Sequence, residues 1–273
     1  MEAVKKVRVK SGSTLNYVEV GQGVPIILIH GLFLDRTSFE QQIKAFASQA
    51  RIIAIDIHGH GGSSLLNQPM SLDEMAEDYL DLVQQLEIQQ AIWGGVSLGG
   101  MTSLRIAIRH PEHVLGLLLL NTSASAGEGK KVPSFHGLNA VLTLRFLWNT
   151  QFMKRLVVKN LCSPTSLETN PNIEKIWVER MKQISSISVK HSVESVLSAS
   201  SILEQLPSIT APTIIAGGEE DTALPMFLSQ EIHKRISHST LVEVEKCGHS
   251  LPIEQPQRVN QLLEQLLREV NCS

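Results

Sequence analysis

The sequence predicts an α/β protein with a mostly parallel, eight-stranded sheet, helices on both of its faces and an inserted helical cap. Three observations lead to this fold class. Short runs of consecutive apolar residues recur along the chain, amphipathic stretches lie between them, and this alternation stops between about residues 127 and 206. With 273 residues, of which 42% are hydrophobic and 19% charged, the chain is long enough to bury a sizeable core.

The first two expected strands differ from the others. Residues 4–9 and 15–20 alternate apolar and polar side chains, and the run Ser11-Gly12-Ser13 between them is a turn signal. This alternation is typical of an antiparallel pair of strands with one face exposed to water.

The remaining strands are expected to be buried on both faces. A continuous apolar run such as residues 26–29 (Ile-Ile-Leu-Ile) has no polar alternation, which is the pattern of a strand covered by helices on each side. Amphipathic stretches supply the helices, and Ser71 with Glu74 forms a capping box at the start of one. Strands that alternate with helices imply right-handed βαβ units and a parallel sheet. The expected strands are 26–29, 52–55, 91–93, 117–120, 213–216 and 241–244, and the expected helices are 38–48, 72–86, 101–109 and 256–270.

Residues 127–206 are expected to form the helical cap, inserted into a core made of residues 1–126 and 207–273. Apolar residues of this segment recur at helical spacing. The segment carries ten Lys and Arg against six Glu, a net charge of +4 in a chain whose formal charge is −3. Ordinary solvated helix faces account for this excess, and a basic rim that favours anionic substrates is the alternative.

The composition argues against several classes of function. A net charge of −3 does not indicate nucleic acid or an anionic membrane as the main partner. Cys162, Cys247 and Cys272 are too widely spaced for a disulfide framework or a metal-ligand set. The first ten residues lack the apolar segment of a signal peptide, and the longest apolar run, near 117–120, is too short to cross a bilayer. A cytoplasmic protein is therefore expected, and its oligomeric state does not follow from the sequence.

The most informative motif is residues 95–99, Gly-Val-Ser-Leu-Gly. It follows an apolar run and precedes a helix-like segment, which is the strand–turn–helix context of a nucleophile elbow. In so tight a turn the residues two before and two after Ser97 must be small, and Gly95 and Gly99 meet this condition. The motif predicts Ser97 as a nucleophile and the N–H of Leu98 as one half of an oxyanion hole.

Other polar residues also follow expected strands, and functional groups gather at the carboxyl ends of strands in open α/β sheets. A serine, an acidic cluster and a histidine occur there in that order. In chain order, the groups are His30-Gly31-Leu32-Phe33, then Asp56, His58 and His60, then Ser97, then Glu219-Glu220-Asp221, and finally Cys247-Gly248-His249.

Together these motifs resemble the α/β-hydrolase family over nearly the whole chain. Within the family the chain is similar to small esterases, enol-lactonases and cofactor-free haloperoxidase-like enzymes. The matching motifs are His-Gly at 30–31, Asp-x-His-Gly-His-Gly-x-Ser at 56–63, Gly-x-Ser-x-Gly at 95–99, Gly-x-x-Asp at 218–221 with Pro225, and Gly-His at 248–249 with Glu254 and Pro256.

The resemblance implies a catalytic triad of Ser97, His249 and Asp221 that works without a cofactor. A serine hydroxyl is a poor nucleophile at neutral pH, so His249 accepts its proton and passes it to the leaving group, while Asp221 fixes the imidazole. The N–H groups of Leu32 and Leu98 are expected to bind the oxyanion of the tetrahedral intermediate.

Further residues have an expected place near this triad. Glu219 and Glu220 remain alternatives for the acid, although the resemblance favours Asp221, because its spacing to Pro225 matches the family's motif. His30 is expected to shape the oxyanion hole from a buried loop rather than to act as an acid or base. The expected substrate-binding residues are His30, Phe33, Leu144, Trp148 and Phe152, with core packing as the alternative role of those in the cap.

Asp56, His58 and His60 have two interpretations, a metal cluster or a structural loop. The resemblance favours the structural loop, so no metal site is expected. His58 stands where the family often has arginine, and a salt bridge of this loop is therefore expected to be absent.

The sequence thus predicts a serine hydrolase that cleaves a small-molecule carboxylic ester, lactone or thioester through an acyl-enzyme. A carboxylate nucleophile, as in epoxide hydrolases and haloalkane dehalogenases, is excluded because the elbow carries Ser97. The alternatives are C–C bond hydrolysis or acyl transfer to an acceptor such as peroxide on the same triad, and a non-catalytic ligand receptor that keeps the fold.

Overall fold

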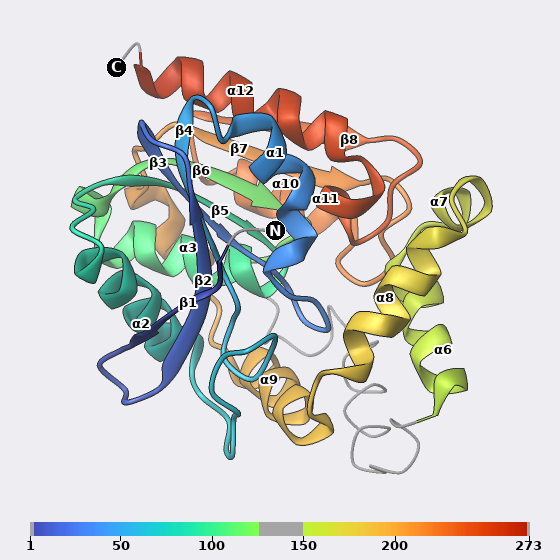
Figure 1. The fold of residues 1–273 in the computed structure, drawn as a ribbon. Helices are drawn as coiled ribbons and strands as arrows, with labels where there is room; N and C mark the ends of the chain where they lie inside the picture. Colours follow the sequence, from blue (N-terminus) through green and yellow to red (C-terminus); the bar gives the residue numbers. More distant parts are fainter. Residues whose placement is uncertain (1–2, 126–149, 272–273) are drawn as a thin grey trace.

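A computed structural model of the chain describes residues 3–125 and 150–271 (Figure 1). At its centre is an eight-stranded sheet with the order β1-β2-β4-β3-β5-β6-β7-β8. β2 is antiparallel to both β1 and β4, and all other neighbouring pairs are parallel, so the predicted mostly parallel sheet is confirmed. The strands are β1 (Lys5–Arg8), β2 (Thr14–Val20), β3 (Val24–Ile29), β4 (Ala50–Ile55), β5 (Ala91–Val96), β6 (Val114–Leu120), β7 (Thr213–Gly218) and β8 (Ser239–Val244).

Alternate side chains of the inner strands enter two separate hydrophobic cores. In β3, Ile27 and Ile29 belong to one core while Ile26 and Leu28 belong to the other, and all four are at most 1% exposed. Because helices cover both faces, neither face of these strands needs polar residues. This explains the continuous apolar runs in the sequence.

Helices pack on both faces of the sheet (Figure 1). Residues of α2, α3 and α10 contribute to the core that contains Ile27, and residues of α1, α11 and α12 contribute to the core that contains Ile26. The predicted capping box is present, with Ser71 Oγ accepting the Glu74 N–H and the Glu74 carboxylate accepting the Ser71 N–H. These helices are α1 (Glu40–Phe46), α2 (Leu72–Gln85), α3 (Leu98–Arg109), α10 (Met226–His233), α11 (Leu251–Glu254) and α12 (Pro256–Asn271), with short 3-10 turns at η1 (Arg36–Phe39), η2 (Pro111–His113) and η3 (Leu203–Ser208).

The described chain between β6 and β7 is helical, in agreement with its apolar spacing. We call α6 (Gln151–Leu161), α7 (Pro164–Thr169), α8 (Asn172–Lys182) and α9 (Ser186–Ser198) the helical segment. It contacts the stretch between β4 and α2 through hydrogen bonds, among them those from the N–H of Leu66 to Ser188 Oγ and from the N–H of Met70 to Ser195 Oγ. Leu144 and Trp148, two of the expected substrate-binding residues, lie outside the described residues.

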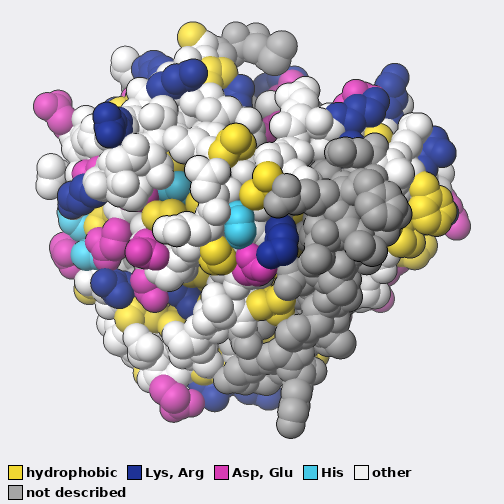
Figure 2. All heavy atoms as spheres, turned by 90° about the horizontal axis from the view of Figure 1, so that it is seen from below, with side chains coloured by type: hydrophobic (Ala, Val, Ile, Leu, Met, Phe, Trp, Pro, Cys, Tyr) yellow, Lys and Arg dark blue, Asp and Glu magenta, His cyan; other side chains and the backbone are white. Residues whose placement is uncertain are grey.

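Figure 2 shows the surface of the molecule from below, where basic and acidic side chains are interspersed over the described part of that face. This distribution is that of ordinary solvated helices and loops. Within residues 3–125 and 150–271, no helix combines the length and apolar character that crossing a membrane requires.

Candidate active site

Ser97 lies in a sharp turn between β5 and α3. Its backbone has φ 56° and ψ −118°, a conformation that L-residues rarely adopt and that costs on the order of 1–3 kcal/mol. Neighbouring hydrogen bonds hold the turn in place, since the Ser97 N–H donates to Leu120 O at 3.0 Å and Thr122 Oγ1 donates to Ser97 O at 2.7 Å. The strained turn predicted from the motif is therefore present, and the end of β6 supports it.

The two glycines that flank Ser97 have no space for a side chain. A Cβ on Gly95 would lie 2.2 Å from the Gly99 carbonyl carbon, and a Cβ on Gly99 would lie 2.0 Å from Ile29 O. Both contacts involve backbone, which cannot move away as a flexible side chain can. The small residues at these positions are thus required by the close approach of α3 to β5 and β3.

Asp221 and His249, which follow β7 and β8, are in direct contact. His249 Nδ1 lies 2.7 Å from Asp221 Oδ2, and the residues are 7% and 5% exposed respectively. The other carboxylate oxygen, Oδ1, accepts the N–H groups of Ala223 (2.8 Å) and Leu224 (3.0 Å). These bonds fix the carboxylate, and because Nδ1 faces it, Nε2 is the His249 ring nitrogen that has no hydrogen-bond partner among residues 3–125 and 150–271.

The two neighbouring acids point elsewhere. Glu219 accepts the N–H of Lys246 at 3.1 Å, and Glu220 accepts the hydroxyl of Thr165 on α7 at 2.7 Å. Of the three acids that the sequence left as alternatives, Asp221 alone bonds to the histidine ring among the residues that the structure describes.

Asn121 is a residue of this site that the sequence analysis missed. Its Nδ2 donates to Asp221 Oδ2 at 2.6 Å and to Gly248 O at 3.2 Å, so it contacts both the acid and the loop that carries His249. It is fully buried at the carboxyl end of β6 with φ 43°. Asn121 follows an expected strand, and β6 lies between β5 and β7 in the sheet, so its place at a strand end is the feature of the sequence that could have pointed to it.

The loop after β3 passes directly over Ser97. A Cβ on Gly31 would lie 3.0 Å from Ser97 Cβ and 3.7 Å from Ser97 Oγ, so the backbone of this loop touches the serine. Leu32 and Phe33 follow, 6% and 1% exposed, and Phe33 has φ 67°. The loop after β3 therefore reaches Ser97 through its backbone, and Leu98, the first residue of α3, directly follows the serine.

His30 holds this loop in place with both of its ring nitrogens. Its Nε2 accepts the Ile57 N–H at 3.1 Å, so Nδ1 carries the proton and donates to Gly31 O at 2.7 Å. Burial lowers its pKa to about 4, so the ring is neutral at pH 7. Both nitrogens are engaged, which fits a residue that shapes the loop and not one that exchanges protons.

The loop after β4 is held by protein contacts. Asp56 forms an ion pair with Arg36 at 2.6 Å and also accepts the N–H groups of Arg36 and Gly62. His58 Nε2 lies 2.9 Å from Asp78 Oδ2 on α2. The expectation that this loop lacks a salt bridge was wrong, because Arg36, 20 residues earlier in the chain, supplies the cation.

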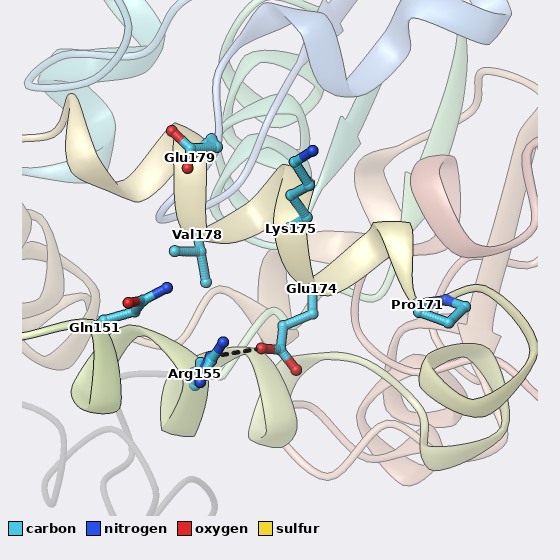
Figure 3. Close-up of a pocket in the computed structure, with 7 residues that line it drawn as sticks. All are labelled: Gln151, Arg155, Pro171, Glu174, Lys175, Val178 and Glu179. Carbon is cyan, nitrogen blue, oxygen red and sulfur yellow. Dashed lines mark ion pairs between the residues drawn. The ribbon is translucent and has the colours of Figure 1, made fainter.

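Phe152, the remaining expected substrate-binding residue, lies on the outer face of α6 and is 74% exposed. A pocket of about 390 Å³ lies between α6 and α8, and Figure 3 shows the ion pair of Arg155 and Glu174 across it. Its lining residues all belong to 151–179, so it is separate from Ser97, Asp221 and His249. The exposure of Phe152 gives no support to a role in binding substrate.

Comparisons with known proteins agree with this geometry. Residues 24–256 match the family model described as the alpha/beta hydrolase fold. The chain is 28% identical over 266 residues to 3-oxoadipate enol-lactonase 2 of Acinetobacter baylyi, covering 94% of each protein. It is 27% identical over 278 residues to a 2-hydroxymuconate semialdehyde hydrolase of a Pseudomonas species, covering 97% of this chain and 94% of that protein.

The fold itself also matches solved structures. A thermophilic esterase from Thermogutta terrifontis superposes with a TM-score of 0.88 at 24% identity, covering 98% of this chain and 99% of the esterase. The family model spans most of the chain, and the mostly parallel eight-stranded sheet and the turn at Ser97 agree with the sequence analysis. The chain belongs to the alpha/beta hydrolase family.

Proposed function

We propose that this protein is a serine hydrolase that cleaves a small carboxylic ester, lactone or thioester through an acyl-enzyme on Ser97. The observation that carries the proposal is the 2.7 Å contact between His249 Nδ1 and Asp221 Oδ2, formed by a buried pair next to the strained serine turn. A histidine held in this way presents Nε2 as a general base.

The proposed reaction uses each of these groups in turn. Ser97 Oγ attacks the substrate carbonyl carbon while its proton passes to His249 Nε2, and the carbonyl oxygen becomes an oxyanion. Collapse of this intermediate breaks the bond to the alcohol or thiol, which takes the proton from His249. Water then attacks the acyl-enzyme by the same route, which releases the acid and restores Ser97. Asp221 stays ionised and stabilises the imidazolium.

The N–H groups of Leu32 and Leu98 are the proposed oxyanion donors. Leu98 directly follows the nucleophile, and Leu32 directly follows Gly31, whose backbone touches Ser97. The two bonds of His30 support the proposal, because they fix the loop before the reaction begins and so pre-organise the donors.

We further propose that residues 127–206 form a cap over a core made of residues 1–126 and 207–273. Ser97 is 3% exposed and His249 7% exposed, so a substrate must enter a largely enclosed site. A small molecule with an apolar part suits such a site. The similarity to an enol-lactonase supports a lactone within this substrate class.

Hydrolysis of a C–C bond is the second candidate reaction on the same residues. The observation that favours it is the similarity, over nearly the whole chain, to the 2-hydroxymuconate semialdehyde hydrolase. Both reactions use an activated serine site and differ in the bond presented to it, so a substrate panel separates them.

Turnover of a panel of short-chain aryl esters, lactones, thioesters and ring-cleavage-type diketones tests the proposal. Ser97→Ala is expected to lower kcat by roughly 10³-fold or more. Ser103→Ala is the matched control, because Ser103 is likewise a buried serine, within α3, and its hydroxyl bonds only to Gly99 O in the described structure. Full activity of Ser97→Ala on a substrate that the wild type cleaves contradicts the proposal.

A further inference from the structure

Glu254, at the end of α11, makes an unusual set of contacts next to the candidate histidine. Its carboxylate accepts three main-chain N–H groups, from Gly248 at 3.0 Å, from Ser250 at 2.9 Å and from Ser163 at 2.8 Å. Gly248 and Ser250 are the two neighbours of His249, whereas Ser163 lies between α6 and α7. One carboxylate thus bonds the histidine loop and the helical segment at the same time.

The helical segment also contacts His249 directly through the backbone. The His249 N–H donates to Leu161 O at the end of α6, at 2.7 Å. A Cβ on Gly248 would lie 2.4 Å from the N of Ser163, so the two stretches of backbone are packed together without a gap. All three N–H groups of residues 248–250 are therefore bonded to groups outside the loop, two to Glu254 and one to α6.

We propose that Glu254 is a positioning residue that ties the loop of His249 to the helical segment, so that the alignment of the imidazole depends on how this segment is seated. The inference rests on the proposed function, in which His249 Nε2 must point at Ser97. Backbone N–H groups bonded to a carboxylate are held more strongly than those bonded to neutral acceptors. Displacement of a reacting group by about 1 Å can lower a rate on the order of 100-fold.

Two substitutions separate positioning from charge. Glu254→Gln keeps the length of the side chain but replaces one acceptor oxygen by an NH2 group, which faces N–H donors and cannot accept from them. Glu254→Asp keeps the charge but is one methylene shorter, so it cannot reach all three N–H groups. If position matters, both variants are impaired, and if only charge matters, Glu254→Asp behaves like wild type.

Thr165→Val is the matched control. Thr165 Oγ1 donates to Glu220 at 2.7 Å, which is another bond between the helical segment and a loop of the core domain. Removing this hydroxyl takes one hydrogen bond from the helical segment but leaves Glu254 and its three main-chain bonds in place, so the contact between the segment and residues 248–250 is kept.

The experiment has two readouts, both scaled to the folded fraction measured by circular dichroism. The first is the rate at which a small fluorophosphonate labels Ser97. The second is the NMR signal of the His249 Nδ1 proton in protein with 15N-histidine, assigned by its loss in His249→Gln. The second readout needs no turnover, so it tests the positioning role even if wild type is not labelled and the proposed function fails.

We expect both Glu254 variants to label about 10- to 100-fold more slowly than wild type. We also expect the Nδ1 proton to exchange faster with water in both variants, because a displaced His249 loop weakens the hydrogen bond from Nδ1 to Asp221. Thr165→Val should stay within about twofold of wild type in both readouts, as expected for loss of a single hydroxyl contact. Three results overturn the inference: wild-type behaviour of both Glu254 variants, a loss confined to Glu254→Gln, or an equal loss in Thr165→Val.

Discussion

Asn121 Nδ2 lies 2.6 Å from Asp221 Oδ2, the same oxygen that His249 Nδ1 contacts. The acid of the proposed triad is therefore shared between the histidine and the amide of the residue that directly follows β6. Because the Asn121 side chain also donates to Gly248 O, it links the carboxylate to the backbone just before His249.

Replacing Asn121 by Ala should reduce activity. The substitution removes one bond to Asp221 and leaves the buried carbonyl of Gly248 without this donor, so we expect kcat/KM to fall on the order of 10-fold or more. Asn121→Asp should be worse, since it places a second carboxylate against Asp221. Steady-state kinetics check this, with the exposed Asn160→Ala as control. Equal kcat/KM for wild type and Asn121→Ala would show that the shared oxygen has no catalytic consequence.

Gly99→Ala should both destabilise the protein and inactivate it. Its Cβ would lie 2.0 Å from Ile29 O, so α3 must move away from β3 and take the Ser97 turn with it. We expect a loss of about 3 kcal/mol or more in the free energy of unfolding, measured by urea denaturation. Gly94→Ala is the control, because the nearest atom to its Cβ would be the movable end of Leu28 at 3.0 Å, while the nearest backbone atom, Ile27 O, would lie at 3.5 Å. A Gly99→Ala protein as stable as Gly94→Ala contradicts the close packing described here.

The ion pair of Arg36 and Asp56 should contribute to stability more than an exposed pair does. The Asp56 side chain is 0% exposed, and Arg36→Met leaves it without its cation. We expect a loss of about 3 kcal/mol in the free energy of unfolding, as is common when one partner of a buried pair is removed. Lys44→Met, which breaks an exposed pair with Glu40, should change the free energy by less than about 0.5 kcal/mol. Similar losses in the two variants would mean that Asp56 is satisfied without Arg36.

Stability should fall on mild acidification because of His30 and His60. Burial lowers their pKa values to about 4 and about 3, from about 6.5 in the unfolded chain. The unfolded chain therefore binds more protons between pH 6.5 and pH 4, so the stability that these residues contribute is complete above pH 6.5 and is lost as pH falls. Each unit of pKa difference corresponds to about 1.4 kcal/mol.

Urea unfolding at several pH values between 7 and 4 checks this expectation. His60→Asn should have a flatter pH dependence than wild type, because its amide can still donate to His58 O, as His60 Nδ1 does at 3.1 Å, but cannot titrate. In His238→Gln, which changes an exposed histidine, the free energy of unfolding should depend on pH as it does in the wild type. If the free energy of unfolding of His60→Asn depends on pH as that of the wild type does, groups other than His60 cause the loss of stability in acid.

The sequence predicts the sheet and the serine turn well, because both leave local patterns. Buried strands such as β3 are continuous apolar runs, and the turn at Ser97 requires glycine two residues away on each side. The sequence could not choose among Glu219, Glu220 and Asp221 on its own, since adjacent acids differ only in the direction of their side chains.

Other features depend on segments that are distant along the chain. Asn121 and Asp221 are 100 residues apart, and Arg36 and Asp56 are 20 residues apart. No periodic pattern or short motif in the sequence therefore indicates either contact. The helical spacing around Phe152 correctly predicts a helix, but it does not say which face of α6 meets solvent. Such contacts follow from the folded arrangement of several elements.

The most direct test of the proposed function is the intact mass of the protein after exposure to a small fluorophosphonate. We predict one adduct on wild type, none on Ser97→Ala at the same dose, and slow labelling of His249→Ala. Peptide mapping should place the adduct on Ser97. An unmodified wild-type mass, or an equal adduct on Ser97→Ala, would contradict an activated serine at this position.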